Sequence, residues 1–540
     1  MKKQSLVGLA AALITICGAP LCEASAQATD LSQYILTPPA PETPRINGAK
    51  VFGVRPGSKF LFTIPATGKR PMTFAADGLP KGLKLDSQTG QITGTVKKAG
   101  TYNVKLTATN DLGSNERNFR IVVGEEIALT PPMGWNSWNC WGNSVSQEKV
   151  LSSARAMVNK GLINYGWTYI NIDDGWQGIR GGKHKGIMPN QKFPGMKAMA
   201  DEIHGMGLKV GIYSGPWVNT YAGHIGSLAD DEDGTYEWIR KGKHNENYMI
   251  NDPEKKITRS TFRYHGKYSF VKNDAKQWGD WDIDYLKYDW NPNDFYYTKE
   301  MADALRTLDR DVVYSLSNNA PYGDAPVWAQ YTNCYRTTGD IRDTWESMSS
   351  IGFAQDKWLS FKKPGHWADP DMLVVGMVGW GPNLHNTKLT ADEQYTHISL
   401  WAILAAPLLI GCDMAQLDDF TLSLLCNNEV IDVNQDPLGI QAYPYYKDNT
   451  YVTYVKHLED GSMAVAMFNK TNEPKKIGFK PKSLGFRGKQ IIRDLWRQKD
   501  LMEIEGDNLY ETIVAPHGVA LVKIYPGISH EKVVKEPIRL

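Results

Sequence analysis

The sequence predicts an α/β protein built on a (β/α)8 (TIM) barrel, with one β-sandwich before the barrel and another after it. A chain of 540 residues is too long for a single hydrophobic core. In its middle part, short apolar segments alternate with helical patterns about eight times, whereas apolar and polar residues alternate with period two on either side. The expected units are a leader (1–26), a linker (27–45), a first sandwich (46–125), the barrel (126–437) and a second sandwich (438–540).

The first residues have the pattern of an export signal. Lys2 and Lys3 precede an apolar run, residues 6–21, and Ala24-Ser25-Ala26 supplies small residues for cleavage before Gln27. No later stretch is long and apolar enough to span a bilayer. We expect an exported protein, periplasmic or extracellular, without membrane insertion.

The first sandwich begins after a Pro-rich linker. Residues 59–64, 100–108 and 118–123 are strand candidates with turn residues between them. Gly78–Leu83 and Thr89–Thr95 resemble segments of the immunoglobulin-like modules found on bacterial secreted enzymes. About eighty residues suffice for such a sandwich.

The barrel is predicted from residue 129 onward, because eight β/α units fit a TIM barrel better than a doubly wound sheet. The strand candidates are Met133–Trp138, Tyr169–Ile172, Lys209–Tyr213, Tyr285–Tyr288, Val312–Leu316, Asn333–Thr337, Gly365–Ala368 and Leu404–Ile410. Helices are expected at Gln147–Lys160, Gly195–Met206, Tyr297–Leu308 and Ala391–Leu404. The polar insert Asn219–Tyr268 is assigned to a loop on the active-site face. After Asn434–Gly439, strands at 451–456, 463–469 and 519–524 predict the second sandwich.

Composition excludes several functions. The net charge of +1 gives no reason to expect nucleic acid as a partner. Cys140, Cys334, Cys412 and Cys426 remain after leader removal, and since none forms a CxxC pair a zinc site is not expected. They could form one or two disulfides, whose pairing the spacing leaves open.

Chemistry in a TIM barrel is expected at the C-terminal ends of its strands. The residues there are Trp138, Asp173, Asp174, Tyr213, Lys287, Asp289, Ser317, Arg336, Asp340, Asp369 and Asp371. A surplus of carboxylates with two cations and aromatic rings suits glycoside cleavage, which needs acceptors for hydroxyls, a proton for the leaving oxygen and negative charge near an oxocarbenium-like transition state. The sequence has no serine-hydrolase elbow, phosphate-binding glycine loop or HExxH motif.

Several motifs carry a family resemblance. They are Leu129–Trp138, Asn171–Trp176, Asp284–Asp289, Trp367–Leu373 and Ala405–Gly411. In this order they resemble the clan D α-galactosidases, glycoside hydrolase family 27, over roughly residues 129–530. The resemblance implies a terminal α-galactoside as substrate, in an oligosaccharide or glycan, and no metal or organic cofactor.

The resemblance also assigns roles to the strand-end residues. Asp289 falls on the family's nucleophile and Asp340 on its acid/base, while Lys287 would bind a hydroxyl and keep Asp289 ionised. The substrate-binding positions are Trp138 at the C6 side, Asp173 and Asp174 at the C4 and C6 hydroxyls, Tyr213 lining the pocket, and Arg336 and Asp371 at the C2 side. Double displacement with retention requires the two catalytic carboxyls roughly 5–5.5 Å apart.

Two departures from the family's pattern affect the substrate. The family commonly has a cysteine shortly after the nucleophile, disulfide-bonded to the loop after strand three, and here Trp290 and Asn291 follow Asp289. Ser317 and Ala320 resemble relatives that accept an N-acetyl group at C2, so an α-N-acetylgalactosaminidase is the first alternative. A β-L-arabinopyranosidase and a non-catalytic glycan-binding protein are the others.

Overall fold

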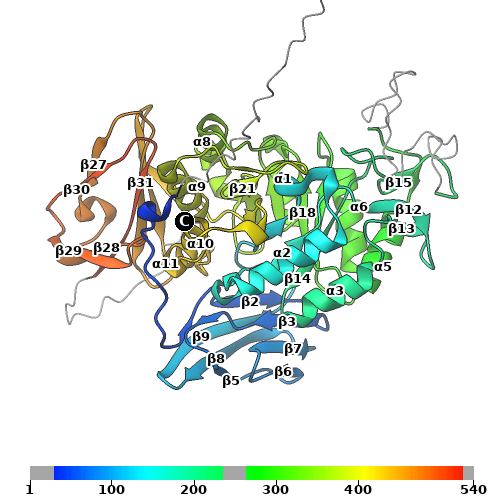
Figure 1. Ribbon diagram of the computed structural model, residues 1–540, viewed down its shortest axis with the longest axis horizontal. Helices are drawn as coiled ribbons and strands as arrows, with labels where there is room; N and C mark the ends of the chain where they lie inside the picture. The colour runs from blue at the N-terminus through cyan, green and yellow to red at the C-terminus, as the bar shows by residue number, and fades with distance from the viewer. Residues whose placement is uncertain (1–29, 235–262, 527–540) are drawn as a thin grey trace, which may run out of the picture.

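The computed structural model describes residues 30–234 and 263–526. The leader and the middle of the predicted insert 219–268 therefore lie outside the described residues. Within them, two β-sandwiches are arranged around a central barrel, the first under its N-terminal end and the second beside it (Figure 1). No described helix is long and apolar enough to cross a membrane.

The barrel is confirmed. Eight parallel strands follow chain order: β10 (Met133–Asn136), β11 (Tyr169–Asn171), β14 (Lys209–Ser214), β17 (Tyr285–Asp289), β18 (Val313–Ser317), β19 (Cys334–Arg336), β20 (Trp367–Asp369) and β23 (Leu408–Ile410). A parallel bridge between Leu373, just past β20, and Ile410 in β23 closes the ring.

Helices cover the outside of the barrel. They are α2 (Gln147–Asn159), α3 (Met196–Gly205), α5 (Val271–Asp280), α6 (Phe295–Arg306), α7 (Ala325–Tyr331), α8 (Trp345–Gly352), α9 (Ala391–Ile403), α10 (Asp419–Leu425) and α11 (Asn428–Asn434). Short strand pairs decorate the loops: β12 (Gln177–Gly181) with β13 (Gly186–Pro189), β15 (Leu228–Ala229) with β16 (Tyr268–Ser269), and β21 (Met377–Val378) with β22 (His385–Asn386). Nearly every residue of α9 is buried, because this helix lies between the barrel and strands β26 (Met463–Asn469) and β31 (Val519–Pro526) of the second sandwich.

Most of the predicted barrel-strand bounds shift by one or two residues, and two of the differences have a local cause. The Asn136 side chain accepts the Trp138 N–H at 2.9 Å, which turns the chain out of β10 and into the short helix α1 (Trp138–Trp141). The predicted strand 404–410 keeps only its last three residues, because Leu404 still ends α9 and Ala405 has a φ of 50°.

The first sandwich has the predicted immunoglobulin-like layers. One sheet orders β2 (Val51–Val54), β9 (Gly113–Val123), β8 (Gly100–Asn110) and β5 (Thr73–Asp77). The other orders β3 (Lys59–Thr63), β7 (Gln91–Thr95) and β6 (Leu83–Leu85), and β1 (Arg45–Ile46) pairs with β4 (Ala66–Thr67). These strands enclose a core of their own, with Phe60, Ile92 and Ile121 among its buried residues.

This module is fixed to the base of the barrel. The Arg55 guanidinium donates to Asp311 at 2.7 Å and also to the backbone carbonyls of Arg306 and Leu308. A cleft between the two units is lined by Lys209, whose ammonium lies 4.6 Å from the ring centre of Phe52. The cleft is therefore at the opposite end of the barrel from the strand-end carboxylates.

The described part of the predicted linker also packs on the barrel. Leu31, Ile35 and Leu36 contact the barrel's core, and the Tyr395 hydroxyl donates to Tyr34 while accepting the Leu36 N–H. The chain therefore runs along the protein surface before it enters the first sandwich.

The second sandwich combines two antiparallel sheets. The larger orders β24 (Tyr443–Lys447), β25 (Tyr451–His457), β26 (Met463–Asn469), β31 (Val519–Pro526), β28 (Lys489–Asp494) and β29 (Lys499–Glu505). The smaller pairs β27 (Lys475–Phe479) with β30 (Tyr510–Val514). Residues of β25 and β26 alternate between this sandwich's own core and the core shared with the barrel, as period two requires.

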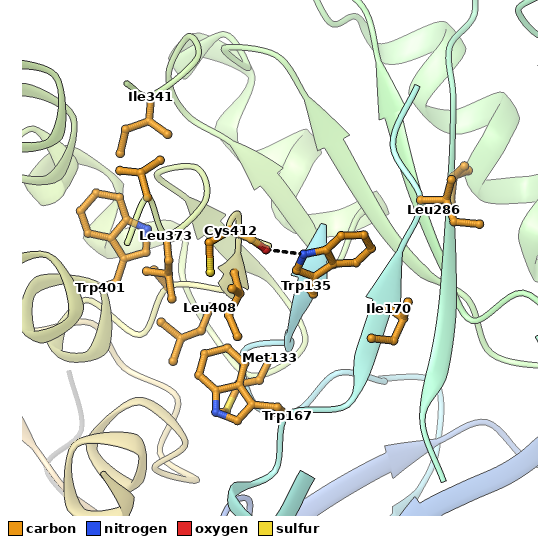
Figure 2. Packing of buried hydrophobic residues seen from close by; sticks show 14 of the residues in the cluster. Met133, Trp135, Trp167, Ile170, Leu286, Ile341, Leu373, Trp401, Leu408 and Cys412 are labelled. Carbon is orange, nitrogen blue, oxygen red and sulfur yellow. Dashed lines mark hydrogen bonds between the residues drawn. The ribbon is translucent and has the colours of Figure 1, made fainter. Parts of the chain in front are cut away.

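Tryptophans fill the space around the barrel wall. Figure 2 shows Trp135 of β10 donating to the Cys412 carbonyl at 2.8 Å, with Ile170 and Leu286 on neighbouring strands. A buried indole N–H needs such an acceptor. The same pattern, apolar ring and satisfied N–H, recurs at Trp167 and Trp401, so these rings belong to the core.

Candidate active site

The described carboxylates at the strand ends converge around β17. Lys287 and Asp289 are two residues apart and therefore project from the same face of this strand, into the barrel mouth. Tyr288 between them points the other way, into the core with Trp290. The β17 sequence thus places one cation and one carboxylate side by side.

Asp289 is buried, and one of its oxygens makes no hydrogen bond. Its Oδ2 accepts from the Tyr213 hydroxyl at 3.0 Å, whereas its Oδ1 has no hydrogen-bond partner among the described residues. Burial raises the pKa of Asp289 to about 6, against the opposing effect of the Lys287 and Arg336 cations. An oriented carboxylate with a free oxygen can act as a nucleophile.

Lys287 joins Asp289 to the end of β11. Its ammonium donates to Asp173 Oδ2 at 2.8 Å. Burial alone would lower the pKa of Lys287, but the carboxylates of Asp173 and Asp289 outweigh it and raise the pKa. This lysine therefore stays charged between two acceptors that a sugar hydroxyl could also reach.

Arg336, at the end of β19, is the centre of a second polar cluster. Its Nη2 donates to Asp340 Oδ1 at 2.6 Å and to Asn318 Oδ1 at 2.8 Å, and its Nε donates to the Thr338 carbonyl at 3.1 Å. The Asp340 side chain is 52% exposed, while that of Arg336 is 5% exposed. Asp340 therefore lies at the solvent-exposed edge of the site, paired with the buried Arg336 guanidinium.

Asp371 supports the segment that carries Asp340. Its two oxygens accept the backbone N–H groups of Ile341 at 2.8 Å and Met372 at 2.9 Å, and Oδ1 lies 3.6 Å from Arg336 Nη1. Because Ile341 follows Asp340 directly, Asp371 fixes the backbone beside that carboxylate. Besides the sugar contact predicted from the sequence, Asp371 therefore has a positioning role.

Asp174 has a comparable role on the other side of the mouth. Its Oδ1 accepts from the Thr220 hydroxyl at 2.8 Å and its Oδ2 from the Ala222 N–H at 2.7 Å. Both donors belong to the loop that follows β14, the third barrel strand. Burial raises the pKa of Asp174 to about 7. This carboxylate holds the loop that presents Tyr221 to the site.

Comparison with known proteins identifies the family. A family model described as alpha galactosidase A matches residues 130–240 and 250–436, and the model of its C-terminal β-sandwich domain matches residues 448–524. The chain belongs to the alpha galactosidase A family. It is a glycoside hydrolase. An immunoglobulin-like domain model matches residues 43–124 in front of it.

Individual relatives agree with this assignment. This chain is 36% identical over 372 residues to alpha-galactosidase A of Cellvibrio japonicus, and the match covers 65% of this chain and 78% of the relative. It is 34% identical over 398 residues to the alpha-galactosidase of Cyamopsis tetragonoloba, covering 72% and 85%. A solved structure from Bacteroides fragilis, titled as a candidate α-galactosidase/melibiase, matches with a TM-score of 0.77 and 33% identity, covering 92% of this chain and 100% of that one.

Most of the sequence-predicted site residues of this glycoside hydrolase are brought together by direct contacts. Asp173 contacts Lys287, Tyr213 contacts Asp289, and Arg336 contacts Asp340 and Asp371. Trp138 is half-buried at the start of α1. Ser317 ends β18 with its hydroxyl buried and unpartnered among the described residues.

Two residues at the site were missed in the sequence analysis. The Tyr221 hydroxyl lies near the Asn318 side chain, and burial, followed by the charge of Asp289, raises its pKa to about 12. Tyr221 lies in the polar insert, where no strand end marks it. Asn318 follows directly after a predicted strand end, Ser317, so extending the search by one residue could have found it.

The four cysteines within residues 30–234 and 263–526 are all free thiols. Cys140, Cys334 and Cys412 are buried and Cys426 is half-buried. Neither of the disulfides that the sequence left open is present among the described residues.

Proposed function

We propose that this glycoside hydrolase removes terminal α-linked galactose from oligosaccharides or glycans with retention of configuration. The observation that carries the proposal is the pairing of two unlike carboxylates: Asp289, buried with one free oxygen, and Asp340, half-exposed on Arg336. A retaining glycosidase needs one inner carboxylate as nucleophile and one outer carboxylate as acid/base. The family assignment and the α-galactosidases among its relatives support the choice of sugar.

The proposed reaction has two displacements. Asp289 Oδ1 attacks the anomeric carbon while protonated Asp340 gives its proton to the departing glycosidic oxygen. Asp340 then takes a proton from water, whose oxygen displaces Asp289 from the sugar. Arg336 keeps Asp340 oriented in both steps, and the Tyr213 hydroxyl holds the second oxygen of Asp289 so that the free one faces the sugar.

Recognition of galactose is assigned to the Lys287 side of the pocket. Each carboxylate oxygen has a second lone pair, so Asp173 and Asp174 can still accept from the sugar's C4 and C6 hydroxyls. The Lys287 ammonium carries three donors, of which one is used by Asp173. Galactose, with its axial C4 hydroxyl, would meet acceptors and a donor together.

The test is parallel hydrolysis of the nitrophenyl glycosides of α-galactose, α-N-acetylgalactosamine and β-L-arabinopyranose. Cleavage of the first, with the α-anomer of galactose as the initial product by NMR, supports the proposal. Preference for the second would assign the chain to the alternative suggested by Ser317 and Ala320, and preference for the third would assign it to the arabinopyranosidase alternative.

The nucleophile assignment has its own test. Asp289→Ala should lose at least about 10³-fold in kcat/KM. Azide, which can enter the space left by the carboxylate, should restore release of an activated leaving group from this variant and yield a galactosyl azide of inverted configuration. Hydrolysis by Asp289→Ala at the wild-type rate would remove Asp289 from the mechanism.

We also propose that the protein is exported and cleaved near Ala26. Support comes from the charged start, apolar run and small-residue site of the first 26 residues. Mass spectrometry of the protein recovered outside the cytoplasm should find a mature chain that begins at Gln27. A cytoplasmic protein that keeps its first residues would overturn this part.

A further inference from the structure

The C2 side of the proposed sugar pocket has two small residues in its wall. Ser317 and Ala320 are both buried, with exposed fractions of 1% and 2%, and the Ala320 N–H donates to the Arg336 carbonyl at 2.7 Å. By size alone, these positions would leave room for an acetamido group at C2. That room decides whether the enzyme takes galactose or N-acetylgalactosamine.

Asn318, between them in sequence, carries a larger polar side chain at the surface of the pocket. Its amide oxygen accepts from Arg336 Nη2 at 2.8 Å, on the same guanidinium nitrogen that holds Asp340. Its backbone carbonyl accepts from the Asn291 side chain at 2.9 Å, which anchors the residue from below. Asn318 is half-buried, whereas its two neighbours in the wall are buried.

Tyr221 approaches Asn318 from the loop after β14, and only β17 separates that strand from β18. Its hydroxyl lies near the Asn318 side chain, while its ring packs 5.3 Å from that of Trp217 and 4.4 Å from the guanidinium carbon of Arg263. The adjoining residues Thr220 and Ala222 are held by Asp174. These contacts hold the Tyr221 side chain in one position.

We propose that the bridge Tyr221–Asn318–Arg336 closes the C2 side of the sugar pocket and makes the enzyme selective for a 2-hydroxyl over a 2-acetamido group. This inference rests on the proposed glycosidase function. It reverses the substrate preference that Ser317 and Ala320 alone suggest, because the space over them is crossed by two other side chains. Tyr221 and Asn318 are thus specificity determinants, and Arg336 positions both Asn318 and Asp340.

The experiment compares kcat/KM for nitrophenyl α-galactoside and nitrophenyl α-N-acetylgalactosaminide in wild type and variants. Wild type should favour the galactoside by at least about a hundredfold, because a closed pocket must clash with the acetamido group. Asn318→Ala keeps the backbone carbonyl that Asn291 binds, and should reduce that ratio at least about tenfold by raising kcat/KM for the acetamido substrate.

Two controls separate this role from a general loss of structure. Asn318→Asp retains an acceptor of similar size for Arg336 and should keep the wild-type selectivity. Asn110→Ala makes the same chemical change in the immunoglobulin-like module and should also leave the ratio unchanged. Tyr221→Phe, which loses the hydroxyl but keeps the ring, should shift the ratio in the direction of Asn318→Ala.

The outcomes are distinguishable. A wild type that cleaves the galactoside, with a ratio that Asn318→Ala leaves unchanged, overturns the inference while the proposed function stands. A wild type that cleaves both substrates equally well also overturns the inference alone. A wild type that cleaves neither overturns the proposed function, and the inference falls with it.

Discussion

The electrostatics of the two proposed catalytic carboxylates, Asp289 and Asp340, predict an unusual pH dependence, which Asp340→Ala should expose. Burial raises the pKa of Asp289 to about 6. Burial would also raise the pKa of Asp340, but Arg336 and Lys287 outweigh it and leave that pKa below its ordinary value of 3.8. The proposed first step needs the reverse arrangement, with Asp289 ionised and Asp340 protonated.

The size of the effect follows from these two pKa values. The pKa of Asp289 lies above that of Asp340, and each whole number between them is a factor of ten in population, or 1.36 kcal/mol. Only a minor fraction of the free enzyme is therefore in the reactive state between the two pKa values. Above about pH 6, the decline of kcat/KM follows the loss of the proton held by Asp289, although Asp289 is the proposed nucleophile.

The variant should reverse the direction of this limb. With a dinitrophenyl galactoside, whose leaving group needs no proton, Asp340→Ala requires only that Asp289 be ionised. Its kcat/KM should rise with pH, with a midpoint at or slightly below about 6, since the Asp340 charge that helps to raise the pKa is gone. The assay is kcat/KM from about pH 4 to about pH 8 for wild type and variant. A variant whose kcat/KM is already constant from about pH 5 upward would show that Asp289 has an ordinary pKa and would refute the reasoning.

Two further predictions concern residues that hold other parts of the protein in place. Asp371→Ala leaves the Ile341 N–H without its acceptor, so the backbone beside Asp340 is no longer fixed. We expect kcat to fall at least about tenfold in steady-state kinetics, while KM changes less. A loss of kcat/KM that came from KM alone would contradict this prediction. Arg55→Ala removes the pair with Asp311 beneath the barrel and should lower the free energy of unfolding by about 2 kcal/mol with kcat unchanged. Denaturant titration measures the free energy of unfolding, and an activity assay of the folded protein measures kcat. A parallel loss of kcat would mean that the immunoglobulin-like module shapes the active site.

The barrel could be predicted from sequence because its strands are buried on both sides and read as short apolar runs, as in Tyr285–Tyr288. Strand ends were harder. The turn at Asn136 depends on a local side-chain hydrogen bond. Leu404 is the C-cap of α9, a helix that is buried on nearly every side, so neither boundary shows in the periodicity.

The site could be predicted as far as it sits at strand ends. Lys287 and Asp289 follow from the alternation of one strand, and the other carboxylates from the same rule applied to its neighbours. The strand-end rule does not say which carboxylate oxygens already accept hydrogen bonds from the protein itself. The engagement of Asp174 by Thr220 and Ala222 joins segments more than forty residues apart and emerges only when the chain is folded.

Asp174 fastens the loop after the third barrel strand with a carboxylate, and the four described cysteines stay as thiols. Oxygen and reductants therefore do not decide whether the sugar pocket is assembled. The same arrangement can form in the reducing interior of a cell and in the oxidising space outside it. An enzyme built this way can be produced in the cytoplasm of an expression host, without disulfide catalysts, and should keep full activity in the presence of a thiol reductant.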